Sequence, residues 1–241
     1  MSVVIRRAAP TDAGAIAAIA LEAFGERLEA ESDRVARVLR QNTNFVAQSD
    51  DRVAGFVGNF VTRSGSGALR FELDLLAVAE DTRGIGIGGA LVAASLDAAE
   101  KAKVDVIRAL VASRNRTMQG LCQMQGFKRN LTSHALYVLT TLPPHSDCKS
   151  DIRDGAGLSS AIRHEAHLIP VETLTYSGIW LEGNLSQVAI HDARKRANVS
   201  GMTRIGTVLP QAAKSPRELL AANGFDRVGE FDWWTVTLRS G

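Results

Sequence analysis

A run of glycines follows an expected strand end and opens an expected helix, which makes it the segment best suited to bind an anion. Leu76-Ala77-Val78 ends the strand, Arg83 follows it, and the helix reaches about Lys101; between them stand Gly84, Ile85, Gly86, Ile87, Gly88 and Gly89. Glycine lets the backbone turn tightly and approach a ligand closely. The unpaired N–H groups and positive dipole end of a helix bind phosphate, and Arg83 adds a charge-assisted hydrogen bond. These residues predict a diphosphate site.

Two carboxylates precede this segment on the same strand. Glu72 and Asp74 occupy alternate positions, so their side chains share one face. An alkylammonium group must lose a proton before its nitrogen can attack an acyl group, and a carboxylate that is reached directly or through water accepts that proton. We expect Glu72 to be the base, with Asp74 as second candidate. The alternative is that both are solvated strand residues.

A dinucleotide site is a competing interpretation of the glycines. Gly84-x-Gly86-x-x-Gly89 fits the dinucleotide fingerprint, and Asp105 lies 21 residues after Gly84. However, the ribose-binding acid of that motif ends a strand, whereas Asp105 begins one. A hairpin also precedes the glycines where a strand–helix–strand unit is required. A loop that serves only to turn the chain is a third interpretation.

The elements expected around the glycines alternate between strands and helices. Residues 2–7 have strand character, 12–27 and 32–40 are helical, and 44–48 with 53–61 form a hairpin around Ser49-Asp50-Asp51-Arg52. A strand at 70–78 leads to the glycine helix, and a strand (104–111), a helix (117–125) and a strand (136–140) follow. This order predicts an α/β (α+β) fold with a mixed twisted sheet flanked by helices.

An internal repeat follows at a constant offset of 98 residues. Leu121, Gly126, Phe127, Arg129 and Val138 align with Leu219, Gly224, Phe225, Arg227 and Val236. We expect a complete domain at 1–141, a linker at 142–156 and a degenerate half-domain at 157–241. The second copy has Glu182-Gly183-Asn184 where the first has its glycines, so it lacks a phosphate loop. Of Trp233 and Trp234, one ring is expected to face the core and the other a pocket or interface.

Two of these segments resemble motifs of the GNAT superfamily of N-acetyltransferases. Arg83-x-x-Gly86-x-Gly88 after Leu-Ala-Val resembles motif A, and Asn115 with the short helix that ends at Gly126-Phe127 resembles motif B. The element order over residues 2–141 is also similar to the GNAT fold. The half-copy is then a second, partial GNAT-like domain.

The resemblance implies acetyl-CoA as acyl donor and direct acetyl transfer to an amine. The pyrophosphate of acetyl-CoA would bind the segment from Arg83 to Gly89. Its pantetheine arm would bind the backbone of Leu76, Ala77 and Val78 and would contact Asn115. A backbone N–H near Leu76 or Ala77 would support the oxyanion. Cys122 replaces the tyrosine that protonates the leaving thiolate in many members. Three alternatives follow: Cys122 donates this proton, water donates it, or the site is catalytically weak. The alternative function is a non-catalytic acyl-CoA-binding or regulatory module.

The amino-acid composition limits the classes of binding partner that we expect. The chain has 28 Lys+Arg against 26 Asp+Glu, so we expect neither a nucleic-acid nor an anionic-membrane partner. Its longest apolar run, about nine residues, is too short to span a bilayer. Two cysteines, Cys122 and Cys148, make no disulfide framework, so we expect a cytoplasmic protein, without a metal. The amine acceptor, small or peptidic, stays open, and the C-terminal half-domain is a possible homodimer contact.

Overall fold

The chain forms two compact units, each built from more than one stretch of sequence. The computed structural model describes residues 3–25, 28, 32–141 and 166–238. One unit contains residues 1–133, 172–176 and 230–241, and the other contains 134–171 and 177–229. The linker expected at 142–156 lies outside the described residues.

The first unit has the element order that the sequence predicts. Its elements, with β6 continuing into the second unit, are β1 (Val3–Arg7), α1 (Ala13–Phe24), α2 (Asp33–Gln41), β2 (Phe45–Ser49), β3 (Arg52–Arg63), β4 (Leu69–Val78), α3 (Ile87–Lys101), β5 (Val106–Ala112), α4 (Arg116–Met124) and β6 (Lys128–Thr140). Its strands lie in the order β1-β2-β3-β4-β5-β10, where β10 (Asp226–Thr237) comes from the end of the chain. Only β4 and β5 run parallel.

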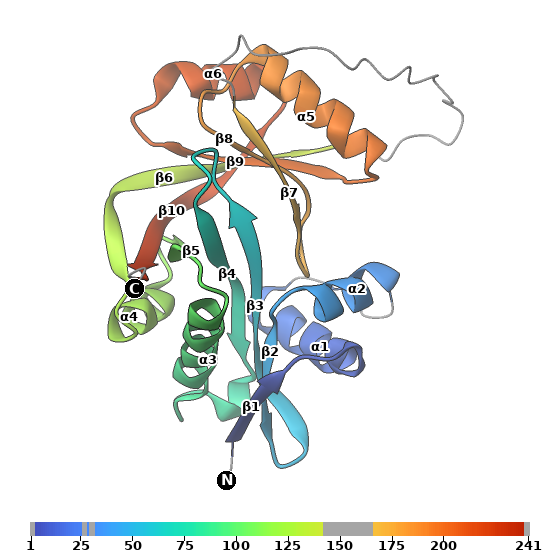
Figure 1. The fold of residues 1–241 in the computed structure, drawn as a ribbon, viewed down its shortest axis with the longest axis vertical. Helices are drawn as coiled ribbons and strands as arrows, with labels where there is room; N and C mark the ends of the chain where they lie inside the picture. Colours follow the sequence, from blue (N-terminus) through green and yellow to red (C-terminus); the bar gives the residue numbers. More distant parts are fainter. Residues whose placement is uncertain (1–2, 26–27, 29–31, 142–165, 239–241) are drawn as a thin grey trace. The chain divides into compact units, whose positions relative to one another are not determined.

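Helices cover both faces of this sheet (Figure 1). One core cluster joins α3 and α4 to one face through residues such as Leu91, Cys122 and Phe71. A second cluster packs α1 and α2 on the other face through Ile16 and Val38. Burial of apolar side chains on both faces makes this a three-layer core and fixes β4 and β5 at its centre.

The hairpin between β2 and β3 confirms the turn chemistry expected from the sequence. Asp50 and Asp51 have φ values of 46° and 64°, and Ser49 pairs with Arg52. Two consecutive residues with positive φ form a type I′ turn, whose twist matches that of the flanking strands. The turn therefore fixes the register of the strand that leads into β4.

The second copy repeats the first with the predicted offset. It contains β7 (His167–Glu172), β8 (Ser177–Glu182), α5 (Gln187–Val199), β9 (Arg204–Pro210), α6 (Lys214–Ala222) and β10 (Asp226–Thr237). Shifting β5 and α4 by 98 residues gives the bounds of β9 and α6. The sequence does not predict β7, because Pro170 in its middle argues against a strand; proline is tolerated at a sheet edge, where β7 lies.

The two copies exchange their last strands. The last strand of the second copy, β10, completes the sheet of the first unit, and the last strand of the first copy, β6, completes the sheet of the second unit. In the first unit, Phe231–Thr237 of β10 pair antiparallel with Val106–Ala112 of β5. In the second unit, His134–Thr140 of β6 pair antiparallel with Arg204–Pro210 of β9. The boundaries predicted at 141 and 157 follow the sequence repeat, whereas the compact units divide within β6 and β10. A repeat offset does not reveal such an exchange, since either pairing preserves it.

No helix in the described part of the chain is both long and apolar enough to cross a membrane. Among the same residues, no group of three His, Cys, Asp or Glu side chains is arranged to hold a metal ion.

Candidate functional site

The parallel pair β4 and β5 separates half-way along its length. Pairing runs from Arg70 opposite Val106 to Leu73 opposite Ala109 and stops there. Both strands continue, β4 for five residues and β5 for three. The sheet is therefore split at β4 residues 74–78, the place where the resemblance puts the thioester.

A β-bulge in β4 marks the start of this split. Val57 of β3 pairs with Leu76 and Asn59 with Leu73, so Asp74 and Leu75 together oppose Gly58. The extra residue changes which face each later side chain occupies. Leu73 packs in the cluster with α3, and Leu75 in the one with α1 and α2.

Backbone direction shows which groups of β4 line the split. The Ala79 N–H donates to the Ala54 carbonyl of β3 at 2.9 Å, and successive residues of a strand direct their N–H groups to opposite sides. The N–H of Ala77 therefore points to β3, and those of Leu76 and Val78 point to the side where β5 has moved away. An N–H group in this position has no ladder partner to satisfy it.

The glycine segment forms an open helix N-terminus beside this split. Gly84 and Gly86 have φ values of 83° and 91°, which other residues adopt only with strain, and Gly86 is the N-cap of α3. No N–H group of residues 84–89 donates to another described residue, and the first bond of the helix runs from Ala90 N–H to Gly86 O at 3.1 Å. The loop thus presents a row of donors at the positive end of a 15-residue helix.

Arg83 lies beside these donors and is held in place by two interactions. Its Nε donates to the Val78 carbonyl at 3.0 Å, and its Nη2 contacts Glu22 Oε1 at 3.2 Å. Half of the Arg83 side chain is exposed. An exposed ion pair contributes about 1 kcal/mol or less, so an anion at the loop can compete with Glu22 for this guanidinium.

The two predicted carboxylates have different surroundings. Glu72 is 5% exposed; its Oε1 accepts from Thr62 Oγ1 at 2.6 Å, and its two oxygens accept from Arg108 Nε at 2.9 and 2.7 Å. Asp74 is exposed and stands on the bulge. Glu72 is thus an anchored, ion-paired carboxylate, and Asp74 is the one that solvent reaches at the split.

Asn115 and Cys122 belong to α4, near the loop. Asn115 is the N-cap, and its Oδ1 accepts the Met118 N–H at 3.0 Å. Cys122 is fully buried in the core cluster, and burial raises the pKa of its thiol to about 11. Proton transfer from such a thiol to an ordinary thiolate of pKa ~8.5 is uphill by about 3 kcal/mol.

Sequence reasoning missed three side chains around Glu72: Thr62, Arg108 and Arg70, whose Nε lies 3.5 Å from Glu72 Oε1. Arg108 is a charge on an otherwise apolar strand, which was the available signal for a buried pair. Its guanidinium carbon lies 4.1 Å from the centroid of the Trp233 ring. The neighbouring Trp234 faces the core, as expected for one of the two rings.

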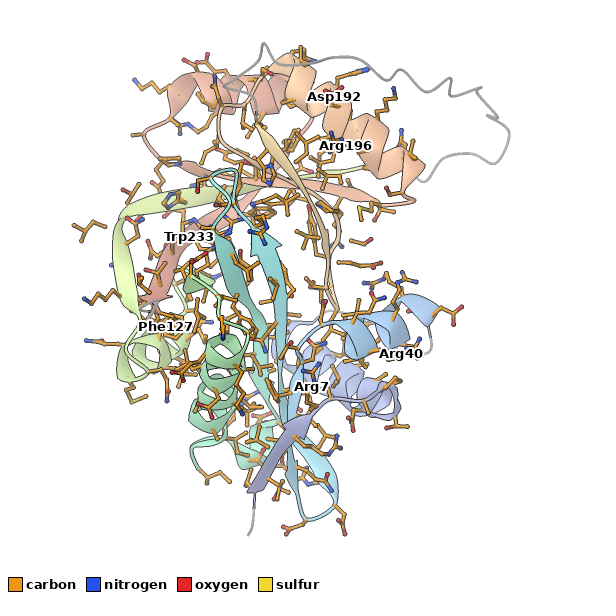
Figure 2. The ribbon with its side chains drawn as sticks, in the orientation of Figure 1. Arg7, Arg40, Phe127, Asp192, Arg196 and Trp233 are labelled. Carbon is orange, nitrogen blue, oxygen red and sulfur yellow. The ribbon has the colours of Figure 1, made fainter. Side chains whose placement is uncertain are left out.

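The second copy closes the position where the first has open donors. Gly183 has a φ of 96°, but Ser186 is the N-cap of α5 and accepts the Ala189 N–H at 3.1 Å. The second unit has a groove of about 490 Å³ between α5 and β7, where Figure 2 labels Asp192 and Arg196. It is lined by Leu168, Pro170, Ile179, Asp192, Lys195, Arg196, Val199 and Ser200.

These features define a mixed α/β protein with an open helix N-terminus at a split in its sheet. Residues 14–127 match the family model described as "Acetyltransferase (GNAT) family". The first copy is therefore a GNAT acetyltransferase domain, as its motifs predicted. A search of the curated proteins finds no match to the chain.

Solved structures with the same fold extend over both copies. A protein described as an acetyltransferase from Pyrococcus horikoshii is 17% identical, with a TM-score of 0.61, and the match covers 98% of this chain and 90% of that one. A tandem GNAT protein from the clavulanic acid biosynthesis pathway is 16% identical, with a TM-score of 0.58, and the match covers 100% of both chains. The tandem GNAT fold thus describes the whole chain.

Proposed function

We propose that the first unit binds acetyl-CoA and transfers its acetyl group to an amine. The observation that carries this proposal is the row of N–H groups at residues 84–89 that donate to no other described residue, at the N-terminus of α3 and beside the split between β4 and β5. Those donors fit a pyrophosphate, and Arg83 adds a positive charge. The strand edge of β4 beyond Leu73 offers backbone groups to the pantetheine arm, and Asn115 stands at the start of α4 to contact it.

The chemistry is a direct transfer. The neutral amine attacks the thioester carbonyl, a C–N bond forms, the C–S bond breaks, and the sulfur leaves as a thiolate. Of the two N–H groups that the resemblance offers for the oxyanion, we assign Leu76, because its N–H points into the split whereas that of Ala77 points to β3.

Proton transfer needs a base for the ammonium and an acid for the thiolate. We assign the base to Asp74, which solvent reaches, and an anchoring role to Glu72, whose oxygens are occupied by Arg108 and Thr62. We assign protonation of the thiolate to water, since Cys122 is buried and its thiol is the weaker acid. Glu72 is the alternative base that the sequence favours, and it would act through a water molecule.

Calorimetric titration with acetyl-CoA tests the binding step. We expect Gly86→Val to weaken binding at least tenfold, since valine is strained at a φ of 91° and displaces the donors. Gly14→Ala is the matched control: it lies in α1 with open space around it, and its affinity should be unchanged. Unaltered binding by folded Gly86→Val protein would remove the loop as the CoA site.

Release of free CoA thiol across a panel of amines tests the transfer. With an accepted amine, Asp74→Asn should lower kcat and abolish its rise with pH, whereas Glu72→Gln should lower kcat and keep the profile. The reverse pattern would return the role of base to Glu72.

A non-catalytic acyl-CoA-binding module is the second candidate function. Its support is that Cys122 is packed in the core and Glu72 is held by Arg108, so neither is placed to exchange a proton freely. Tight acetyl-CoA binding without CoA release on polyamines, amino acids, aminoglycosides or peptide N-termini would favour this module over the enzyme.

A further inference from the structure

Three side chains in contact with one another connect residues of the two copies inside the first unit. Trp233 of β10 stacks on the Arg108 guanidinium at 4.1 Å, and Arg108 Nε donates to both oxygens of Glu72. An arginine above an indole face is attracted by the ring quadrupole, more strongly where water is excluded. Here 15% of the Arg108 side chain and 7% of that of Glu72 are exposed.

The position of these three side chains in the sheet relates them to the split. Arg108 pairs with Glu72 one residue before the last β4–β5 pair, Leu73 with Ala109. Trp233 pairs with Leu110, the first residue of β5 beyond that pairing. The ion pair and the ring therefore stand at the apex of the split, and Figure 2 shows Trp233 on β10.

We propose that Trp233 is a positioning residue of the acetyl transfer site, supplied to the first unit by the degenerate copy. The ring fixes one orientation of the Arg108 guanidinium, and this guanidinium fixes the Glu72 carboxylate at the apex, where the acceptor amine meets the acyl group. The proposal rests on the proposed transfer function. It gives the second copy a part in acceptor use that does not require a ligand of its own.

Steady-state kinetics with an accepted amine test the proposal. We expect Trp233→Leu to lower kcat/KM for the amine about tenfold, the size of a desolvated cation–π contact, and to leave the acetyl-CoA dissociation constant within twofold. Trp233→Phe keeps an aromatic face and should recover most of the loss. Trp234→Phe is the matched control, because it removes the same indole from the same strand on the core face and should not change the kinetics.

A double-mutant cycle separates positioning from general damage. Arg108→Met and Trp233→Leu should each lower kcat/KM, and the double variant should be no slower than the worse single variant, since both break the same connection. Multiplicative effects would overturn the proposal. So would equal losses in Trp234→Phe, or a Trp233→Leu loss confined to acetyl-CoA binding.

A cycle on stability keeps the test independent of turnover. Absence of turnover on every amine would refute the proposed function, but it would not refute the connection between Trp233, Arg108 and Glu72. In that case the urea midpoints of Glu72→Gln, Trp233→Leu and the double variant decide. Non-additive midpoints would support a connection through Arg108, and additive midpoints would refute it.

Discussion

Trp234 tests whether the first unit depends on a strand from the second copy. It lies on β10 opposite Ala109 of β5, is 6% exposed, and packs in the core cluster that α3 and α4 share. If β10 completes this sheet, truncation of Trp234 opens a cavity in the acetyltransferase domain. If the first copy completed its own sheet with β6, the same change would hardly affect it.

The expected loss follows from the size of the side chain and the quality of its site. Truncation of a buried tryptophan to alanine costs about 3–5 kcal/mol, against a total of about 5–15 kcal/mol for a domain. The Trp234 Nε1 group is buried without a hydrogen-bond partner among the described residues. Removing such a donor recovers about 1–3 kcal/mol, so Trp234→Phe should cost much less than Trp234→Ala.

Urea unfolding of the full chain, followed by circular dichroism, measures both variants. We expect Trp234→Ala to lose at least 3 kcal/mol and Trp234→Phe about 1 kcal/mol or less. With acetyl-CoA bound as proposed, part of the lost midpoint should return, because a ligand that binds only the folded state stabilises it. A loss below about 1 kcal/mol in Trp234→Ala would refute the placement of β10 beside β5.

Three further predictions concern other parts of the first unit. Because burial raises the pKa of Cys122 to about 11, the folded chain keeps a proton that the unfolded chain loses above pH ~9. The free energy of unfolding should therefore fall by about 2 kcal/mol between pH 9 and 11, and Cys122→Ala should remove that part of the slope in urea titrations. A hydrogen bond from Arg6 holds the pKa of Asp12 below its ordinary value despite burial. Asp12 therefore stabilises the fold above pH ~4 and loses this effect as the pH falls through its folded pKa. Asp12→Asn should lower the free energy of unfolding by about 1 kcal/mol at pH 7 and change it little at pH 2. Gly55→Ala should lower the melting temperature, since its Cβ would lie 2.9 Å from a β4 carbonyl oxygen, whereas Gly14→Ala should raise it. A stable Gly55→Ala variant would contradict the β3–β4 geometry.

Local patterns were sufficient to predict the two tight turns and the order of elements. Gly84 and Gly86 need positive φ, and Ser49-Asp50-Asp51-Arg52 forms a tight turn, because residue type and backbone conformation are directly coupled at such positions. The offset of 98 residues gave the bounds of α6 from those of α4, since repeated cores repeat their hydrophobic spacing.

Features that depend on pairing across the chain could not be predicted in this way. The bulge at Asp74 and Leu75 depends on the register with β3, and it alters which side chains share a face. The surroundings of Glu72 depend on Arg108, 36 residues away, and on Trp233 from the other copy. The position of a carboxylate in a strand therefore does not reveal which side chains surround it in the folded sheet.

The exchange of last strands also explains what the second copy has lost and what it has kept. Where the first copy has its glycine loop, the second has Ser186, which caps α5 and accepts the Ala189 N–H. Its last strand, in contrast, supplies Trp234 to the core of the first unit and the buried Asp232. Burial acts to raise the pKa of Asp232, but hydrogen bonds from Arg129, Ser133 and Ser113 and the Arg129 charge lower it, so the carboxylate stays ionised and paired. The second copy is therefore a structural part of the first unit through β10, although it has no counterpart of the first copy's glycine segment.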